Sequence, residues 1–184
     1  MIKAKVAIFC GSMYGPNKSH IKIAQEVTSY LVSNNFGIVY GGGQNGIMGV
    51  VANTALELRG HVTGIIPNFL NKREKIHKKL NKIIITKTME ERKKKFLSIS
   101  DIFIALPGGG GTIEEISLVV SANQLNIINN KKMIIFNYKN YWSPLIKQYL
   151  KLPSANYAHK DILDNLSVCE DINGLSKIIS KIKI

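Results

Sequence analysis

The stretch that decides the fold runs from Ile102 to Leu125 and reads IFIALPGGGGTIEEISLVVSANQL. Its first five residues are all apolar, which is typical of a strand buried on both faces of a sheet. A proline and four glycines follow, and apolar residues then recur at helical spacing. A strand, a tight turn and a helix in this order are the repeating part of a parallel βαβ unit.

The same alternation of short β-branched runs and longer helical patterns extends along the rest of the chain. It predicts an α/β fold, a Rossmann-like doubly wound parallel sheet in a three-layer sandwich, with residues 1–184 forming a single domain. Strands are predicted at about Lys5–Cys10, Gly37–Tyr40, His61–Ile66, Lys82–Thr86, Ile102–Leu106 and Lys132–Phe136. Helices are predicted at about Lys18–Ser33, Ile47–Leu58, Met89–Ser100, Thr112–Leu125, Ser143–Leu152 and Asn173–Lys183. Pro67–Asn81 is the least regular segment and predicts a surface loop or short helix over one edge of the sheet.

Length and composition describe one globular domain. The chain has 184 residues and a mean hydropathy of +0.03, with no run near the roughly 18 apolar residues that span a bilayer. The apolar run Val6–Cys10 is shorter than the roughly 7–15 residues of a signal-peptide core, so we expect a cytoplasmic protein. Cys10 and Cys169 are far apart in sequence, and this spacing indicates neither a disulfide framework nor a metal site.

The basic composition raises nucleic acid as a partner. Lys and Arg total 25 against 12 Asp and Glu, a formal net charge of +13. The lysines are spread over the whole chain, and the densest stretches, Lys72–Lys82 and Arg92–Lys95, lack the interleaved aromatic residues that stack on single strands. We therefore do not expect nucleic acid to be the main partner.

Three glycine-bearing turns follow predicted strands and should meet at the carboxyl edge of the sheet, where doubly wound folds bind ligands. Glycines expose backbone N–H groups, and a helix N-terminus adds partial positive charge, so three such turns favour a phosphate-bearing ligand. The alternative is that each glycine serves only to turn the chain. The candidate binding residues are Gly11 and Ser12 in the first turn, Gly42 and Gly43 in the second, and Gly108, Gly109, Gly110, Gly111 and Thr112 in the third.

Two common nucleotide sites are not supported by these turns. Gly41-x-Gly43-x-x-Gly46 matches the dinucleotide fingerprint, but the next strand ends in Pro67-Asn68 without the acidic residue that holds a ribose. The Gly108–Thr112 turn has no lysine before its threonine, so it does not match the phosphate-binding loop of nucleoside triphosphatases.

The helix after the third turn carries two acidic residues with different surroundings. Thr112 followed by Glu115 fits a capping box, which predicts Thr112 as the N-cap. Glu115 shares its helix face with Leu118 and Val119, where a carboxylate is costly without a partner. Glu114 points about 100° away, toward a more polar face.

The preceding predicted helix, Met89–Ser100, also carries a charged residue on its apolar face. Arg92 lies on the apolar face of Met89 and Phe96, which predicts that it meets an anion, either a ligand or a carboxylate in an ordinary ion pair.

These residues resemble a known family. Leu106–Glu115 resembles the PGGxGTxxE motif of the LOG ("Lonely guy") phosphoribohydrolases, and Met89–Lys93 resembles that family's M-x-x-R-K segment. Further matching segments stand in the family's order and bring the resemblance to residues 5 to about 150: Phe9–Ser12, Val39–Gly43, Gly46–Gly49 and Ile65–Pro67.

The resemblance implies a hydrolase that cleaves the N-glycosidic bond of purine nucleoside 5′-monophosphates, with adenine or an N6-modified adenine (a cytokinin) as the base. It implies no cofactor, no metal and a homodimer. The helix Thr112–Leu125 is apolar around most of its circumference and Ile47–Leu58 is likewise broadly apolar, so we expect these helices to contribute to the interface. The alternative is that the chain buries both helices within its own sandwich. The implied catalytic residues are Arg92 and Glu115. The implied substrate contacts are Glu74, Met89, Lys93, Glu114, Ser121 and the phosphate-binding residues Gly109–Thr112. The alternative is a non-catalytic nucleotide or molybdenum-cofactor carrier on the same fold.

Overall fold

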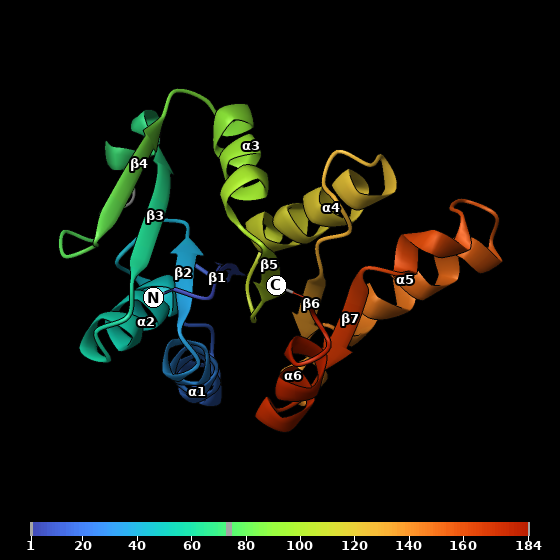
Figure 1. Ribbon diagram of the computed structural model, residues 1–184, viewed down its shortest axis with the longest axis horizontal. Helices are drawn as coiled ribbons and strands as arrows, with labels where there is room; N and C mark the ends of the chain where they lie inside the picture. The colour runs from blue at the N-terminus through green and yellow to red at the C-terminus, as the bar shows by residue number, and fades with distance from the viewer. Residues whose placement is uncertain (1, 73–74, 184) are drawn as a thin grey trace.

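The computed structural model describes residues 2–72 and 75–183, and it is built on one parallel sheet between two layers of helices (Figure 1). Within the described residues the sheet has seven strands in the order β4-β3-β2-β1-β5-β6-β7, and every neighbouring pair is parallel. The winding changes direction between β1 and β5. This is the doubly wound α/β architecture that the sequence predicts.

The strands are β1 Ala4–Phe9, β2 Phe36–Tyr40, β3 Val62–Pro67, β4 Lys82–Thr86, β5 Ile102–Ala105, β6 Met133–Phe136 and β7 Leu166–Cys169. The α-helices are α1 Ser19–Ser33, α2 Gly46–Glu57, α3 Met89–Ile99, α4 Gly110–Gln124, α5 Ser143–Ser154 and α6 Ile172–Ile179. Short 3-10 helices are η1 Asn68–Lys72, η2 Tyr138–Asn140 and η3 Lys160–Leu163.

The six predicted strands are confirmed, with every boundary within one residue, but β7 was not predicted. It has only four residues, one of them Ser167, and it pairs with β6 alone at the edge of the sheet. Such a strand is too short and too polar to show a clear alternation. The last helix, predicted at Asn173–Lys183, ends earlier, at Ile179.

Strand β1 shows how the sheet supplies both cores. Val6 and Ile8 pack into the cluster with α1, α2 and α6, whereas Ala7 and Phe9 pack into the cluster with α3, α4 and α5. All four are at most 1% exposed. Successive side chains of a strand point to opposite faces, so a strand at the centre of a three-layer sandwich is apolar throughout.

The start of α4 differs from the prediction. The helix begins at Gly110 with Gly109 as its N-cap, and the Thr112 amide donates to the Gly109 carbonyl at 3.0 Å. The prediction of Thr112 as the N-cap in a capping box with Glu115 is therefore wrong. Thr112 is only 3% exposed, and its hydroxyl lies against Gly108, so its side chain is used for packing inside the turn. Glycine is an acceptable N-cap, which lets the helix extend into the glycine run.

The apolar circumference of α4 is largely covered within the chain. Ile116 and Val119 are fully buried, and the helix packs against the sheet, α3 and η3. Ile113 is 40% exposed and Leu125 is 68% exposed. Helix α2 is likewise buried along Ile47–Met48 and Val51–Ala52. One sandwich therefore covers more of these two helices than their sequences suggest.

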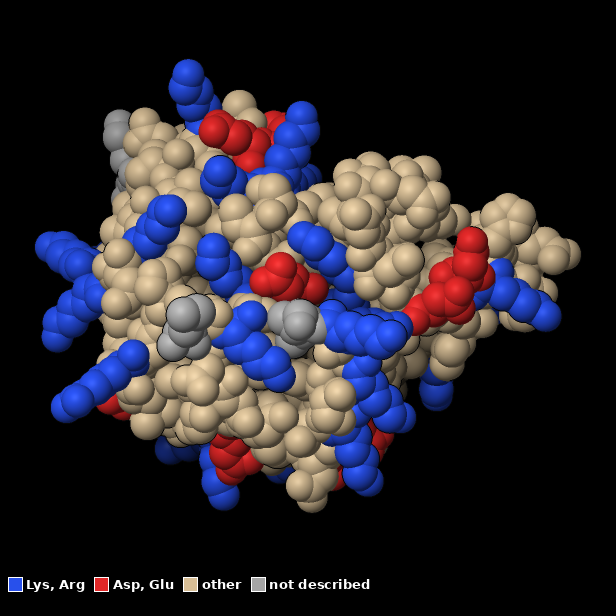
Figure 2. Space-filling view, in the orientation of Figure 1, with Lys and Arg blue, Asp and Glu red and all other residues tan. Residues whose placement is uncertain are grey.

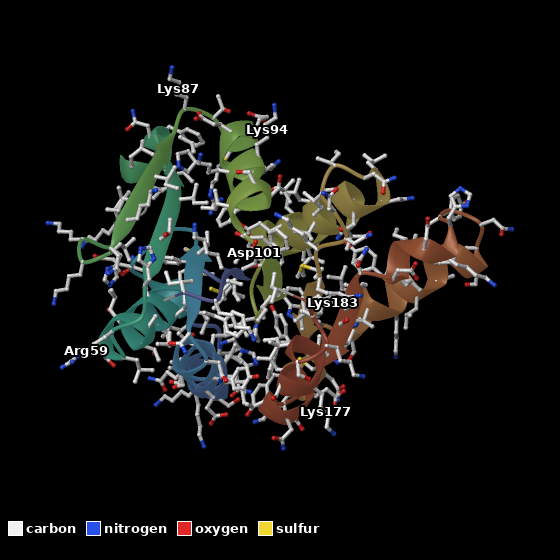
Figure 3. All side chains as sticks on the ribbon, in the orientation of Figure 1. Arg59, Lys87, Lys94, Asp101, Lys177 and Lys183 are labelled. Atoms are coloured by element: carbon white, nitrogen blue, oxygen red, sulfur yellow. The ribbon has the colours of Figure 1, made fainter. Side chains whose placement is uncertain are left out.

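Basic side chains are spread over the surface. Figure 2 shows Lys and Arg on every margin of the visible face, with Asp and Glu among them. The labelled Arg59, Lys87 and Lys177 extend from widely separated elements (Figure 3). This distribution agrees with the spread of lysines along the sequence and shows no single basic patch on the visible face. In the parts of the chain that the structure describes, no helix has both the length and the apolar character needed to cross a bilayer.

The segment after η1 is attached to the second glycine turn. The His77 amide donates to the Gly42 carbonyl at 3.0 Å, and Gly43 forms an antiparallel bridge with Ile76. The His77 ring is buried between two partners. The Lys79 amide donates to its Nδ1 at 3.3 Å, so the proton lies on Nε2, which contacts Asn53 Oδ1 at 2.9 Å. Burial, and secondly the charge of Lys79, lower the pKa of His77.

We predict that His77 makes the protein less stable in mild acid. Because its pKa is lowered in the folded state, the unfolded chain binds more protons, and the free energy of unfolding should fall as pH drops below about 6.5. Denaturant titrations between pH 7 and pH 5 should give a smaller pH slope for His77→Gln than for the wild type. His20, whose pKa burial also lowers, should retain part of the slope.

His159→Gln, which replaces an exposed histidine by the same residue, is the matched control. An equal slope in wild type and His77→Gln would contradict the prediction.

Candidate active site

The structure brings the three predicted glycine turns together around one cavity at the carboxyl edge of the sheet. Its walls include the backbone of Gly11 and Ser12 after β1, Gly41 after β2, and Gly109–Gly111 after β5. Gly46 has a φ of +62°, and a Cβ there would lie 2.2 Å from the Ser12 carbonyl carbon. Only glycine allows α2 to approach the first turn this closely. The cavity has a volume of about 210 Å³.

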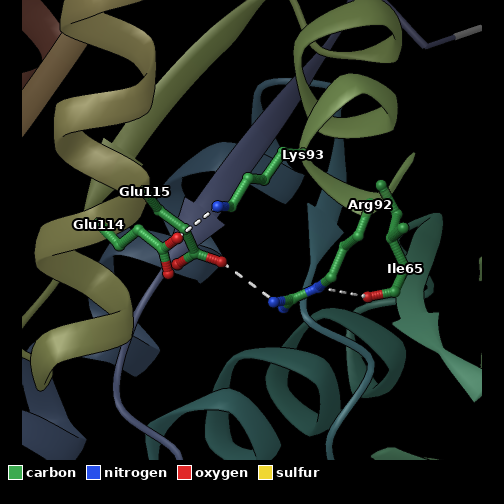
Figure 4. Close-up of polar contacts among 5 residues, drawn as sticks. All are labelled: Ile65, Arg92, Lys93, Glu114 and Glu115. Atoms are coloured by element: carbon green, nitrogen blue, oxygen red, sulfur yellow. Dashed lines mark hydrogen bonds and ion pairs between the residues drawn. The ribbon is translucent and has the colours of Figure 1, made fainter. Parts of the chain in front are cut away.

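The first charged pair in this cavity joins α3 to α4. Arg92 Nη2 lies 3.5 Å from Glu115 Oε1, and the two side chains are only 14% and 16% exposed (Figure 4). The sequence predicted both that Glu115 needs a partner and that Arg92 meets an anion, and the two residues meet each other. Both also line the cavity, so their charges remain within reach of a ligand.

Arg92 is held from three sides. Its Nε donates to the Ile65 carbonyl at 3.2 Å, and its guanidinium carbon lies 5.2 Å from the centre of the Phe96 ring. A Cβ at Gly41 would lie 2.8 Å from Nη2, so the glycine leaves room for the guanidinium. These contacts fix the cation before any ligand binds. A cation that is preorganised in this way can meet an anionic group without further rearrangement.

A second charged pair lies outside the first. Lys93 Nζ contacts Glu114 Oε1, and the side chains are 31% and 51% exposed. The hydrogen bond that the Lys93 ammonium donates to the Glu114 carboxylate raises the pKa of Lys93. Figure 4 shows both pairs joining the same two helices. Because the outer pair is well solvated, it contributes little to stability by itself.

The N-terminus of α4 forms an anion cradle. The amides of Gly110 and Gly111 precede the first intrahelical donor, Thr112, and are therefore free to bind a ligand. No atom lies within 4 Å of a Cβ built at Gly109, Gly110 or Gly111. Packing does not require glycine there, but side chains would fill the space in front of the helix N-terminus, where phosphates bind.

Apolar residues that sequence analysis did not single out form the floor of the cavity: Ile8, Cys10, Met48 and Leu70. Burial, and secondly the Glu115 carboxylate, raise the pKa of the Cys10 thiol, so Cys10 stays protonated and is not a nucleophile at neutral pH. The periodicity of β1 and α2 predicts Ile8 and Met48 as core, whereas Leu70 lies in η1, within the segment predicted as a surface loop or short helix. Periodicity cannot show that these side chains also line a cavity.

Several other predicted contacts do not line this cavity. Gly42 and Gly43 hold the segment around His77, and Met89 stands at the first position of α3. Lys93 and Glu114 contact each other beside the cavity. Ser121 is ten residues along α4 from Gly111, about 15 Å away at the helical rise. Gly108 faces a second cavity behind the turn, and Glu74 lies outside the described residues.

Comparison with known families and proteins gives consistent matches. A family model described as "Possible lysine decarboxylase" matches residues 48–179. A cytokinin riboside 5′-monophosphate phosphoribohydrolase of Arabidopsis thaliana is 38% identical over 142 residues, which are 77% of this chain and 62% of that protein. An enzyme of the same name from Rhodococcoides fascians is 32% identical over 170 residues, 92% of this chain and 85% of that protein.

The chain therefore spans about three fifths of the length of the plant relative. Among solved structures, the molybdenum cofactor carrier protein of Chlamydomonas reinhardtii has a TM-score of 0.71 at 17% identity, and the match covers 97% of both chains. At this identity the likeness shows the fold alone.

Proposed function

Because the chain belongs to the LOG phosphoribohydrolase family, whose model carries the description of possible lysine decarboxylases, we propose that it hydrolyses the N-glycosidic bond of purine nucleoside 5′-monophosphates. The products are the free base and ribose 5-phosphate. The observation that carries the proposal is the Arg92–Glu115 pair in the same cavity as the Gly109–Thr112 cradle. The proposed base is adenine or an N6-modified adenine.

The cradle supports a role for the 5′-phosphate. The Gly110 and Gly111 amides and the helix N-terminus bind it, and this remote binding energy holds the ribose against Glu115. At about 210 Å³ the cavity is below the roughly 300–1,000 Å³ that is typical of ligand pockets. It suits the ribose phosphate, with the base extending outward.

The carboxylate supports the chemical step. As the C1′–N9 bond breaks, its electron pair leaves with the purine, which takes up a proton from solvent, and positive charge develops on the ribose ring. Glu115 stabilises this charge and accepts a proton from the water whose oxygen bonds to C1′, as glycosidase carboxylates do. Glu115 then returns this proton to solvent. Arg92 offsets the charge of Glu115 while no substrate is bound. This chemistry requires no metal or cofactor.

A non-catalytic carrier on the same fold is the alternative. A carrier uses a phosphate cradle but has no need for a nearly buried carboxylate next to the bound sugar. The Arg92–Glu115 pair therefore supports hydrolysis over carriage.

The first prediction from this proposal concerns the phosphate. Purified protein should release adenine from AMP, or the modified base from N6-isopentenyl-AMP, in the presence of a metal chelator. For adenosine, kcat/KM should be at least about a hundredfold lower, because an empty cradle leaves oriented donors unpaired. Chromatography of the released base measures both rates. Equal turnover of AMP and adenosine would rule out the proposed cradle.

The second prediction separates the two glutamates. Glu115→Gln should lower kcat by about 10²–10⁴-fold with little change in KM, because it removes a group needed in the transition state. Glu114→Gln is the matched control. It should raise KM a few-fold and leave kcat within about twofold, because Glu114 lies outside the cavity and contacts Lys93. Similar kinetics for the two variants would contradict the assigned roles.

The third prediction concerns assembly, for which we propose a homodimer that includes α4. The exposed Ile113 and Leu125, with Ile127 just beyond the helix, are the apolar surface available for it. Light scattering should give about twice the chain mass of 20.5 kDa. Leu125→Glu should weaken the dimer, because a two-fold interface contains each substitution twice.

The control for assembly is Leu150→Glu, which changes a similarly exposed leucine on α5. A wild-type chain that is monomeric at micromolar concentration and fully active would overturn the dimer proposal.

A further inference from the structure

The glycine turn before α4 is a thin wall between two cavities. Gly109 lines both the cavity of the Arg92–Glu115 pair and a second cavity of about 470 Å³ on the other side of the turn. The second cavity lies between the turn, residues 11–17 and the β6–α5 connection. The wall therefore has little packing on either side. Glycine has the greatest backbone freedom, so such a segment needs specific contacts to hold one conformation.

One of these contacts comes from Tyr141, whose side chain also lines the second cavity. Its hydroxyl donates a hydrogen bond of 2.6 Å to the Gly108 carbonyl. Gly108 itself lies at a junction. A Cβ there would lie 2.2 Å from Thr112 Oγ1 and 2.8 Å from the Gly11 amide nitrogen. A displacement of Gly108 therefore moves both the start of α4 and the turn after β1.

Tyr141 is in turn held by its surroundings. Lys139 and Asn140 have φ values of 52° and 61°, a left-handed conformation that is uncommon for lysine and sets the direction of the next residue. The Tyr141 ring contacts His20 edge-on with 5.4 Å between ring centres, and it contacts Trp142 at 4.8 Å. Two neighbours and an unusual backbone thus aim one hydroxyl at the glycine turn.

We infer that Tyr141 is a positioning residue that holds the Gly108–Gly111 turn in its phosphate-binding conformation through the Gly108 carbonyl. The inference rests on the proposed function in taking the substrate phosphate as the ligand of the cradle. Tyr141 acts through Gly108, so its loss should weaken phosphate binding and leave the step at Glu115 intact.

The test compares Tyr141→Phe with Tyr138→Phe. Phenylalanine keeps the ring at position 141 and removes only the hydroxyl. Tyr138 is the matched control, since its ring also contacts His20, at 6.2 Å, but it lies away from Gly108. For Tyr141→Phe, KM for AMP and the Kd for inorganic phosphate, measured by calorimetry, should both rise about three- to tenfold, as expected for one lost hydrogen bond. The kcat should change less than twofold.

Each remaining outcome is decisive. A fall in kcat at constant KM, an unchanged phosphate Kd, or the same shifts in Tyr138→Phe would overturn the inference. A wild-type chain that binds phosphate without hydrolysing AMP would overturn the proposed function, and phosphate binding by the two variants would still test Tyr141. A wild-type chain that binds no phosphate would overturn the inference itself.

Discussion

The Arg92–Glu115 contact is the interaction on which the site depends. Each residue stands on a mostly apolar face of its helix, where an unpaired charge is costly. Each is acceptable because the other lies across the gap between α3 and α4. Arg92 Nη2 lies 3.5 Å from Glu115 Oε1, and both residues line the cavity, so the pair is within reach of a ligand. The same contact therefore stabilises two nearly buried charges in the absence of substrate and places both of them for the chemistry that we propose.

The parallel sheet makes this meeting possible. The winding changes direction between β1 and β5, so the turns after these neighbouring strands lie beside each other, and their helices leave toward opposite faces. Arg92 reaches the same place from α3, held by the carbonyl of Ile65 in β3. Three chain segments far apart in sequence thus converge because parallel strands all end at one edge.

The sequence predicts the strands and helices, because these depend on local periodicity. It does not predict which side chains meet, because this depends on how the helices pack in space. Apolar runs such as Ile102–Leu106 located six strands, whereas β7 was too short to be recognised. Helical spacing showed that Arg92 and Glu115 both needed partners. It could not show that they partner each other, because this depends on how α3 and α4 pack. The N-cap was predicted at Thr112 and lies at Gly109, since propensity alone does not show where Thr112 packs.

The two charged pairs between α3 and α4 fix the register of the two helices against each other. Arg92 contacts Glu115 and Lys93 contacts Glu114, so the partners run in opposite order and their numbers have the same sum. Deleting one residue early in α3 would leave all four charges in the chain, but it would rotate the helix by about 100° and place Lys93 at the inner position and Lys94 at the outer one. A cation and a carboxylate could still meet in the cavity, but the ammonium of Lys93 would replace the guanidinium of Arg92 beside Glu115. The positions of these charges along α3 and α4, and not their number, therefore decide which charged groups lie in the cavity.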